Sequence, residues 1–142
     1  MITTIYAQTY SPTQLIGNKY QLIVMESVYD SLIVDSFDND SDYIIHEFTN
    51  TTLLDIDTFG NKVDTLSFPY YLSNVIPIQF DKSRVGKGES GQYLVYLCGT
   101  DEEPMLVYEK ILKLTDNELI LFSPRLPTST GYDSRDKYRR VK

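Results

Sequence analysis

Apolar and polar residues alternate along most of the chain, in short runs separated by turn residues. In the first run, Tyr20, Leu22 and Val24 fall on one face and Gln21 on the other. A period of two is typical of a strand with one buried face. Residues 15–24 are therefore predicted as the first long strand, which the chain enters through a turn at Gly17.

The later runs are separated by recognisable turn chemistry. Asn50-Thr51, Gly60-Asn61 and residues 115–117 mark tight connections. Pro69 is expected to stop a strand, and 70–91 is expected to be the longest irregular region. The remaining strands are predicted at 32–34, 43–48, 53–59, 63–68, 92–98, 105–114, 118–122 and 137–141.

No stretch of the chain keeps a helical period over several turns, so little helix is expected. Many short strands with turns between them indicate an antiparallel sandwich or barrel. Closure removes the exposed edges of a sheet, which favours the barrel. The predicted fold is all-β: a small antiparallel up-and-down β-barrel of about eight strands.

A length of 142 residues, with 42% hydrophobic and 23% charged residues, indicates one folded domain. The barrel is assigned to residues 15–142, and residues 1–14 to a flexible N-terminal arm, because Pro12 disfavours a regular helix there. Cys98 is the only cysteine, so no intrachain disulfide can form. The simplest interpretation of Cys98 is a small buried hydrophobic residue.

The net charge of −7 is unevenly distributed. Residues 1–80 carry ten acids and two bases (−8), and residues 81–142 carry ten acids and eleven bases (+1). This charge argues against general nucleic-acid binding, which depends on neutralising phosphates. The acidic first half either attracts a basic partner or a cation or only solubilises the surface, and the basic residues of 135–142 are expected to pair with it.

The sequence does not fix the cellular location. No apolar run reaches the roughly 20 residues of a membrane helix, so no integral membrane segment is expected. The N-terminus lacks a basic region followed by an apolar core, so no intact signal peptide is predicted. The two alternatives are the cell envelope or the exterior, if a signal peptide has been removed, and the cytoplasm otherwise.

Three segments resemble the small lipocalin-like domains of Bacteroides-type bacteria: residues 15–22 (LIGNKYQL), 111–121 (ILKLTDNELIL) and 138–141 (YRRV). The resemblance implies a barrel of bacterial origin, and it implies a barrel-closing contact between an aromatic residue of the first strand and an arginine of the last. Tyr20 stands where the family usually has tryptophan, so the pair would be Tyr20 with Arg139 or Arg140. The fold alone does not specify a function.

No residue set predicts a catalytic site, a cofactor or a metal. His46 is the single histidine and is interpreted as structural, because a triad or a zinc site needs further placed groups; an enzyme that uses His46 with Glu47 or Asp55 is the minor alternative. The acids at 38, 40 and 42 resemble a calcium loop but lack its later glycine and glutamate. Residues 86–91 fit G-x-G-x-x-G, but a strand rather than a helix is expected to follow.

The function that follows is a non-enzymatic binding module for a small apolar ligand or a protein partner. Tyrosines offer a large apolar surface with a polar tip, which suits the binding of a small ligand or of a protein partner. The alternative is a structural or interaction protein, such as an assembly component or inhibitor, that docks through its acidic half and the long loop 70–91. The predicted ligand-binding residues are Tyr70, Tyr71, Phe80, Tyr93 and Tyr96.

Overall fold

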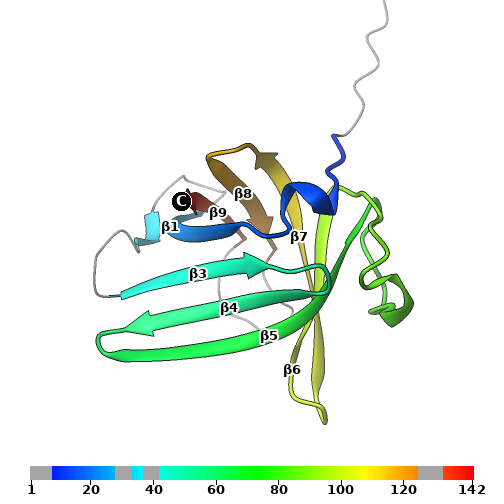
Figure 1. Cartoon of the computed structure of the whole chain (residues 1–142), viewed down its shortest axis with the longest axis horizontal. Helices are drawn as coiled ribbons and strands as arrows, with labels where there is room; N and C mark the ends of the chain where they lie inside the picture. The colour runs from blue at the N-terminus through cyan, green and yellow to red at the C-terminus, as the bar shows by residue number, and fades with distance from the viewer. Residues whose placement is uncertain (1–7, 28–32, 37–41, 125–132) are drawn as a thin grey trace, which may run out of the picture.

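The computed structural model describes residues 8–27, 33–36, 42–124 and 133–142, and of 33–36 only the backbone. These ranges contain nine strands and two short 3-10 turns, Pro12–Gln14 and Lys82–Arg84 (Figure 1). The strands are β1 (Lys19–Ser27), β2 (Ile33–Ser36), β3 (Asp42–Phe48), β4 (Thr52–Phe59), β5 (Lys62–Ser73), β6 (Tyr93–Gly99), β7 (Pro104–Leu114), β8 (Glu118–Ser123) and β9 (Ser134–Val141).

Every strand pairs antiparallel with its neighbour, and β1 pairs with both β3 and β9. Eight strands, β1 and β3–β9, therefore close into a barrel, while β2 pairs with the second half of β1. The predicted small all-β barrel with little helix is confirmed. No helix in the described ranges is long and apolar enough to cross a membrane.

The hydrophobic core gathers where β1 begins. Tyr20 and Leu22 point inward from β1, as their alternation predicts, and the ring of Phe48 lies between Tyr20 and Tyr70, with ring centres 6.1 and 5.4 Å apart. The Tyr20 hydroxyl donates to the Gln14 carbonyl at 3.3 Å. The buried core comprises Tyr10, Leu15, Tyr20, Leu22, Phe48, Leu53, Tyr70, Leu72, Leu94, Ile111, Leu114, Leu119, Leu121 and Tyr138.

The described part of the predicted arm belongs to this end of the barrel. Tyr10 is 3% exposed and forms an isolated bridge with Gly91, with backbone bonds of 2.9 and 3.0 Å. Pro12 is buried in the 3-10 turn, which Ser11 caps. A loose arm was expected because the segment is polar, but Tyr10 supplies enough apolar surface to anchor it. Residues 1–7 lie outside the described residues.

β5 is longer than the sequence indicates. Pro69 was expected to stop this strand, and that expectation is wrong: β5 continues to Ser73, so the irregular segment begins at Asn74. Proline only removes a donor, and a strand tolerates it where the N–H would face no partner. Thr52 pairs with Pro69 on the β4 side, and β6 first meets β5 one residue later, at Tyr70.

Two hairpins diverge from the barrel at this point (Figure 1). The β4–β5 hairpin runs along β3, whereas the far part of the β6–β7 hairpin, Leu97–Leu106, pairs only with itself among the described strands. β5 and β6 are joined only through Tyr70–Ser73 and Tyr93–Tyr96. The sheet is therefore open between Lys62–Pro69 of β5 and the far part of β6, Leu97–Gly99.

Gly91 permits the closest backbone approach in this region. A Cβ atom at Gly91 would lie 2.4 Å from backbone atoms of Ser73. We expect Gly91→Ala to lower the free energy of unfolding by about 1–3 kcal/mol, because the Tyr10 bridge or the end of β5 must shift. Urea unfolding measures the change. The adjacent exposed Ser90→Ala is the control, and equal stability of both variants would contradict the prediction.

Candidate functional site

The first component of the site is the free edge of β5, Lys62–Pro69, which pairs only with β4 among the described strands. Backbone groups alternate in direction along an antiparallel strand. The Tyr70 N–H bonds to Thr51 on the β4 side at 3.2 Å. The N–H groups of Val63, Thr65 and Ser67, at odd positions, therefore face away from β4, and Pro69 has no such group.

The second component is a cleft of about 760 Å³ between the two hairpins. Its walls are β5, β6, β7 and the segment after β5, and its lining includes charged Lys82 and Asp101. Leu66 is 54% and Ile78 is 99% exposed, so the cleft presents apolar surface to solvent. The apolar lining residues are Leu66, Phe68, Pro69, Ile78, Phe80, Leu97, Leu106 and Pro104.

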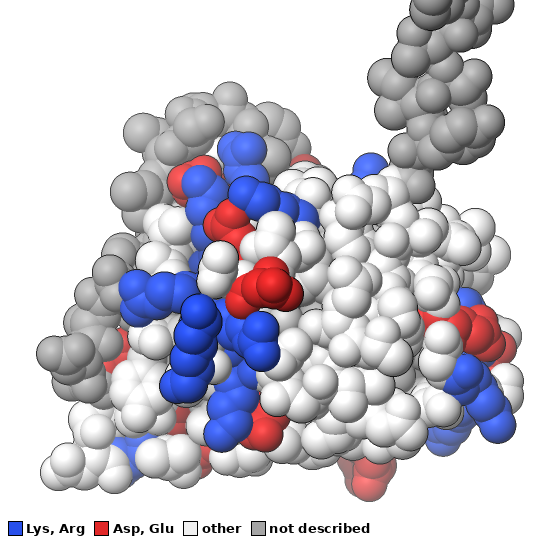
Figure 2. Space-filling model, turned by 45° about the horizontal axis from the view of Figure 1, so that its top comes forward, with Lys and Arg blue, Asp and Glu red and all other residues white. Residues whose placement is uncertain are grey.

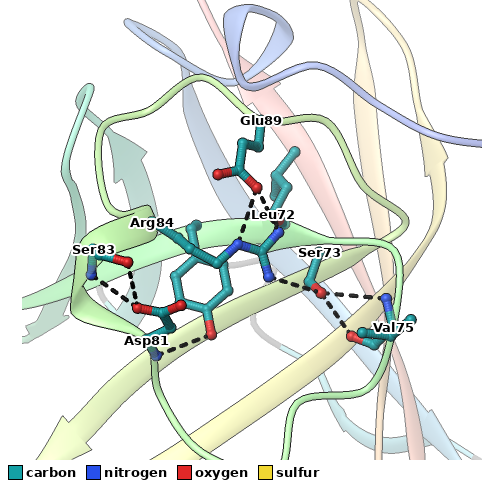
Figure 3. A network of polar contacts seen from close by, with 8 residues as sticks. Leu72, Ser73, Val75, Asp81, Ser83, Arg84 and Glu89 are labelled. Carbon is teal, nitrogen blue, oxygen red and sulfur yellow. Dashed lines mark hydrogen bonds and ion pairs between the residues drawn. The ribbon is translucent and has the colours of Figure 1, made fainter.

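Arg84 fixes the outer wall of the cleft against β5 (Figure 3). Its guanidinium lies over the Tyr71 ring, 4.6 Å from the ring centre, and donates to the Leu72 carbonyl at 3.1 Å. It also pairs with Glu89 at 2.9 Å and reaches the Ser73 hydroxyl at 3.3 Å. These contacts tie the middle of segment 74–92 to the end of β5 on the outside of the barrel.

The third component is an ionisable cluster on the inner face of the barrel: His46, Asp55, Asp57, Glu109 and Asp136. His46 Nε2 lies 3.4 Å from Asp55 Oδ1. The cluster also contacts hydroxyl groups, because Tyr96 donates to Glu109 Oε1 at 2.6 Å and Ser134 donates to Asp136 Oδ1 at 2.8 Å. Strands β3, β4, β7 and β9 each contribute a member.

Burial changes the acidity of this cluster. It raises the pKa of Glu109, which is 3% exposed, to about 7, although the Tyr96 hydrogen bond opposes the shift. Burial and the charge of Asp55 raise the pKa of Asp57 to about 6. Burial also raises the pKa of Asp136. For Asp55 burial acts in the same direction, but hydrogen bonding and the charge of His46 outweigh it and lower its pKa.

Several basic residues outside this cluster form ion pairs with acidic residues. Figure 2 shows a large group of Lys and Arg side chains with acids among them, and a smaller group on the other side of the view. Glu26 pairs with Arg135 at 3.5 Å and with Lys137 at 3.0 Å, and Lys113 pairs with Glu118. The expected pairing of the basic C-terminal residues with the acidic first half is confirmed for Arg135 and Lys137.

The four tyrosines and one phenylalanine predicted to bind a ligand do not converge. Tyr70 is a core residue, and Tyr71 lies on the outer face against Phe80, with ring centres 5.1 Å apart. The rings of Tyr93 and Tyr108 lie on the outer face of the barrel, with their centres 6.3 Å apart. Of the predicted residues, only Tyr96 faces the ionisable cluster. Its ring stacks on that of Phe68, with ring centres 5.9 Å apart. Of the set, Phe80 alone lines the cleft directly.

The predicted barrel-closing pair is Tyr20 with Arg139 or Arg140, and the register distinguishes the two arginines. Arg140 is the cross-strand partner of Tyr20, whereas Arg139 is exposed and is the partner of Gln21. Arg140 Nη2 donates to Asn18 Oδ1 at 2.9 Å and Nη1 donates to the Asp116 carbonyl at 3.3 Å. Arg140 therefore occupies the position next to Tyr20 at the core end of the barrel.

The other candidates have simple placements. Residues 86–91 precede strand β6 rather than a helix, as the sequence predicts. Cys98 is partly buried and lines the cleft. Asp42 accepts a hydrogen bond from the Gly60 N–H at 3.0 Å, while Asp38 and Asp40 lie outside the described residues.

Sequence reasoning missed the ionisable cluster and the free edge. Asp55 and Asp57 alternate with Leu54 and Ile56, so the pattern assigns the aspartates to a solvated face. Leu53, on the same face as both, is 1% exposed, which places that face inside the barrel. The signal that could have indicated the free edge is Pro69, because a proline in a strand is typical of an edge.

Comparison with known proteins adds no relative. No protein-family model, curated protein or solved structure matches the chain.

Glu109 makes the stability of the protein depend on pH. The pKa of about 7 in the folded state exceeds the ordinary 4.5, so the folded state holds the proton more tightly. This stabilisation is complete below about pH 4.5 and is lost as the pH rises through about 7. We expect Glu109→Gln to be more stable than the parent at about pH 8, by up to about 3 kcal/mol, and nearly equal at about pH 5.

Urea unfolding at the two pH values measures this difference. Glu102→Gln, an exposed acid in the β6–β7 turn, is the matched control and should show no such pH dependence. An effect of Glu109→Gln that is the same at both pH values would contradict the assignment.

Proposed function

We propose that the protein is a binding module that takes an extended segment of a protein partner as an additional strand beside β5. The observation that carries the proposal is the free edge of Lys62–Pro69 directly beside an apolar cleft. An edge strand presents unpaired N–H and C=O groups that template pairing with another chain. Strand addition of this kind is a recurrent mode of peptide recognition.

The exposure of β5 supports this role. Lys62–Ser67 are exposed, and apolar Val63 is 61% exposed. Natural edge strands are usually short, charged or covered, because long apolar edges aggregate. A long edge with apolar residues on both faces is therefore a feature that needs a partner. Main-chain hydrogen bonds to Val63, Thr65 and Ser67 would supply affinity.

The cleft supplies a place for side chains of the added strand. Side chains of a strand beside β5 would alternate between its two faces. Those near Ser67 and Pro69 would enter the cleft, where Leu97 and Leu106 offer apolar contact. Burial of one large apolar side chain contributes roughly 1.5–3 kcal/mol. The cleft would thus select for an apolar residue near one end of the segment.

A small apolar ligand is the second candidate, and the size of the cleft favours it. Its volume of about 760 Å³ lies within the roughly 300–1,000 Å³ of ordinary ligand pockets. The lipocalin-like resemblance, which we retain as a proposal, also agrees with a ligand-binding barrel. The exposed strand edge favours the protein partner, because a small ligand would leave that edge unpaired.

Selection from a displayed library of random octapeptides tests strand addition. We expect enriched peptides to lose roughly tenfold or more of their affinity for Thr65→Pro, because proline removes an N–H on the free edge and its ring obstructs pairing. Thr65→Val keeps the N–H and the strand preference, so it is the control. Equal binding to both variants, or no enrichment at all, would contradict the proposal.

Filling the cleft tests the small-ligand candidate. The fluorescence of the apolar dye 1-anilinonaphthalene-8-sulfonate should increase with the parent protein and much less with Leu106→Trp, since tryptophan occupies part of the cleft. Leu112→Trp, on the same strand but outside the cleft and 44% exposed, is the control. Equal fluorescence with both variants would exclude the cleft as the dye site.

A further inference from the structure

We infer that the segment received by β5 carries a basic residue, lysine or arginine, which pairs with acidic residues on the inner side of the β4–β5 hairpin. The inference rests on the proposed strand addition and names the chemistry of the partner. Its basis is a set of aspartates that lies beside the free edge and has few donors of its own.

The register places these aspartates in rows that lead to the free edge. Asp64 of β5 is the direct cross-strand partner of Asp57 on β4, and Asp55 is the partner of Leu66. Directly paired residues project to the same face. A strand added beside β5 would lie about 4.8 Å from it. A basic side chain opposite Asp64 would therefore contact the Asp64 side chain directly. The end of a long basic side chain would reach past Asp64 toward Asp57.

Polar atoms behind this edge lack hydrogen bonds of good geometry. Among the described residues, His46 Nδ1 and Asp57 Oδ1 are buried without a hydrogen bond of good geometry, and the one close polar neighbour of buried Asp55 Oδ1 is His46 Nε2 at 3.4 Å. His46 is only 9% exposed. Buried polar groups in native proteins are nearly always paired, so each such atom requires an explanation. A cationic donor that reaches this side of β4 would satisfy a carboxylate oxygen.

The charge of the surroundings fits a cation. Asp55, Asp57 and Asp64 lie on one face of the hairpin, and Glu109 and Asp136 face the same interior. Lys62 precedes Asp64 by two residues on that face, and in the described ranges no ion pair joins them. The described residues contain no group of His, Cys, Asp or Glu arranged to hold a metal ion. A flexible basic side chain suits this geometry better than a coordinated ion.

Proton linkage provides a second signature. The groups that face Asp57 are His46 on β3, Asp55 on β4 and Asp64 on β5, with Glu109 and Asp136 further inside. Burial and Asp55 raise the pKa of Asp57 to about 6. A cation binds the ionised carboxylate, so it must displace this proton at low pH. Affinity for a basic peptide should therefore rise between about pH 5 and about pH 7.

The same octapeptide library tests the inference at about pH 7, where Asp57 is ionised. We expect enriched peptides to carry lysine or arginine at one fixed position. Replacement of that residue by glutamine should weaken binding to the parent protein roughly tenfold, and much less to Asp64→Asn. Asp116→Asn, an exposed aspartate beside Arg140 at the core end, is the matched control and should behave as the parent. The affinity for the basic peptide should change less between about pH 5 and about pH 7 with Asp57→Asn than with the parent protein.

The outcomes separate the inference from the function on which it rests. Peptides that bind in a Thr65-dependent manner but show no basic preference would overturn the inference and leave strand addition standing. No enrichment, or binding that ignores Thr65→Pro, would overturn both. Formation of a concentration-dependent dimer that is lost in Thr65→Pro, without peptide binding, would identify a second copy of the chain as the occupant and overturn the basic segment.

Discussion

The absence of an N–H at Pro69 is the constraint on which the open part of the molecule depends. β6 pairs with Tyr70–Ser73 of β5. The residue before Tyr70 is Pro69, which has no N–H to donate to β6. The two hairpins separate at this residue, and the cleft lies between them. The free edge of β5, the cleft and the solvent-facing Leu66 all lie at or beyond this proline, whose ring removes the donor.

The barrel divides into two ends of different chemistry. At one end, aromatic and aliphatic residues around Phe48 fill the interior, and the 3-10 turn covers them. Toward the other end, the inward positions of the same strands carry His46, Asp55 and Glu109. Burying these groups costs free energy, as the raised pKa of Glu109 shows. A core that served stability alone would fill such positions with apolar side chains.

The strands and the barrel could be predicted because alternation and turn chemistry are local. Tyr20 and Leu22 were correctly placed inside for this reason. The cluster could not be predicted, because whether Asp55 faces the interior depends on closure and register, which involve residues distant in sequence. The effect of Pro69 was misjudged for a related reason: a proline stops a central strand but only marks an edge, and the sequence does not state which neighbours a strand will have.

Arg84 holds the outer wall of the cleft in one arrangement, through Tyr71, Leu72 and Glu89. Association is opposed by the conformational entropy lost when groups become ordered. Since this wall is already ordered, most of that loss falls on the incoming molecule. If the proposed strand addition holds, rigid or already extended partners would be favoured over flexible ones of identical composition, and stiffness would count as well as chemistry.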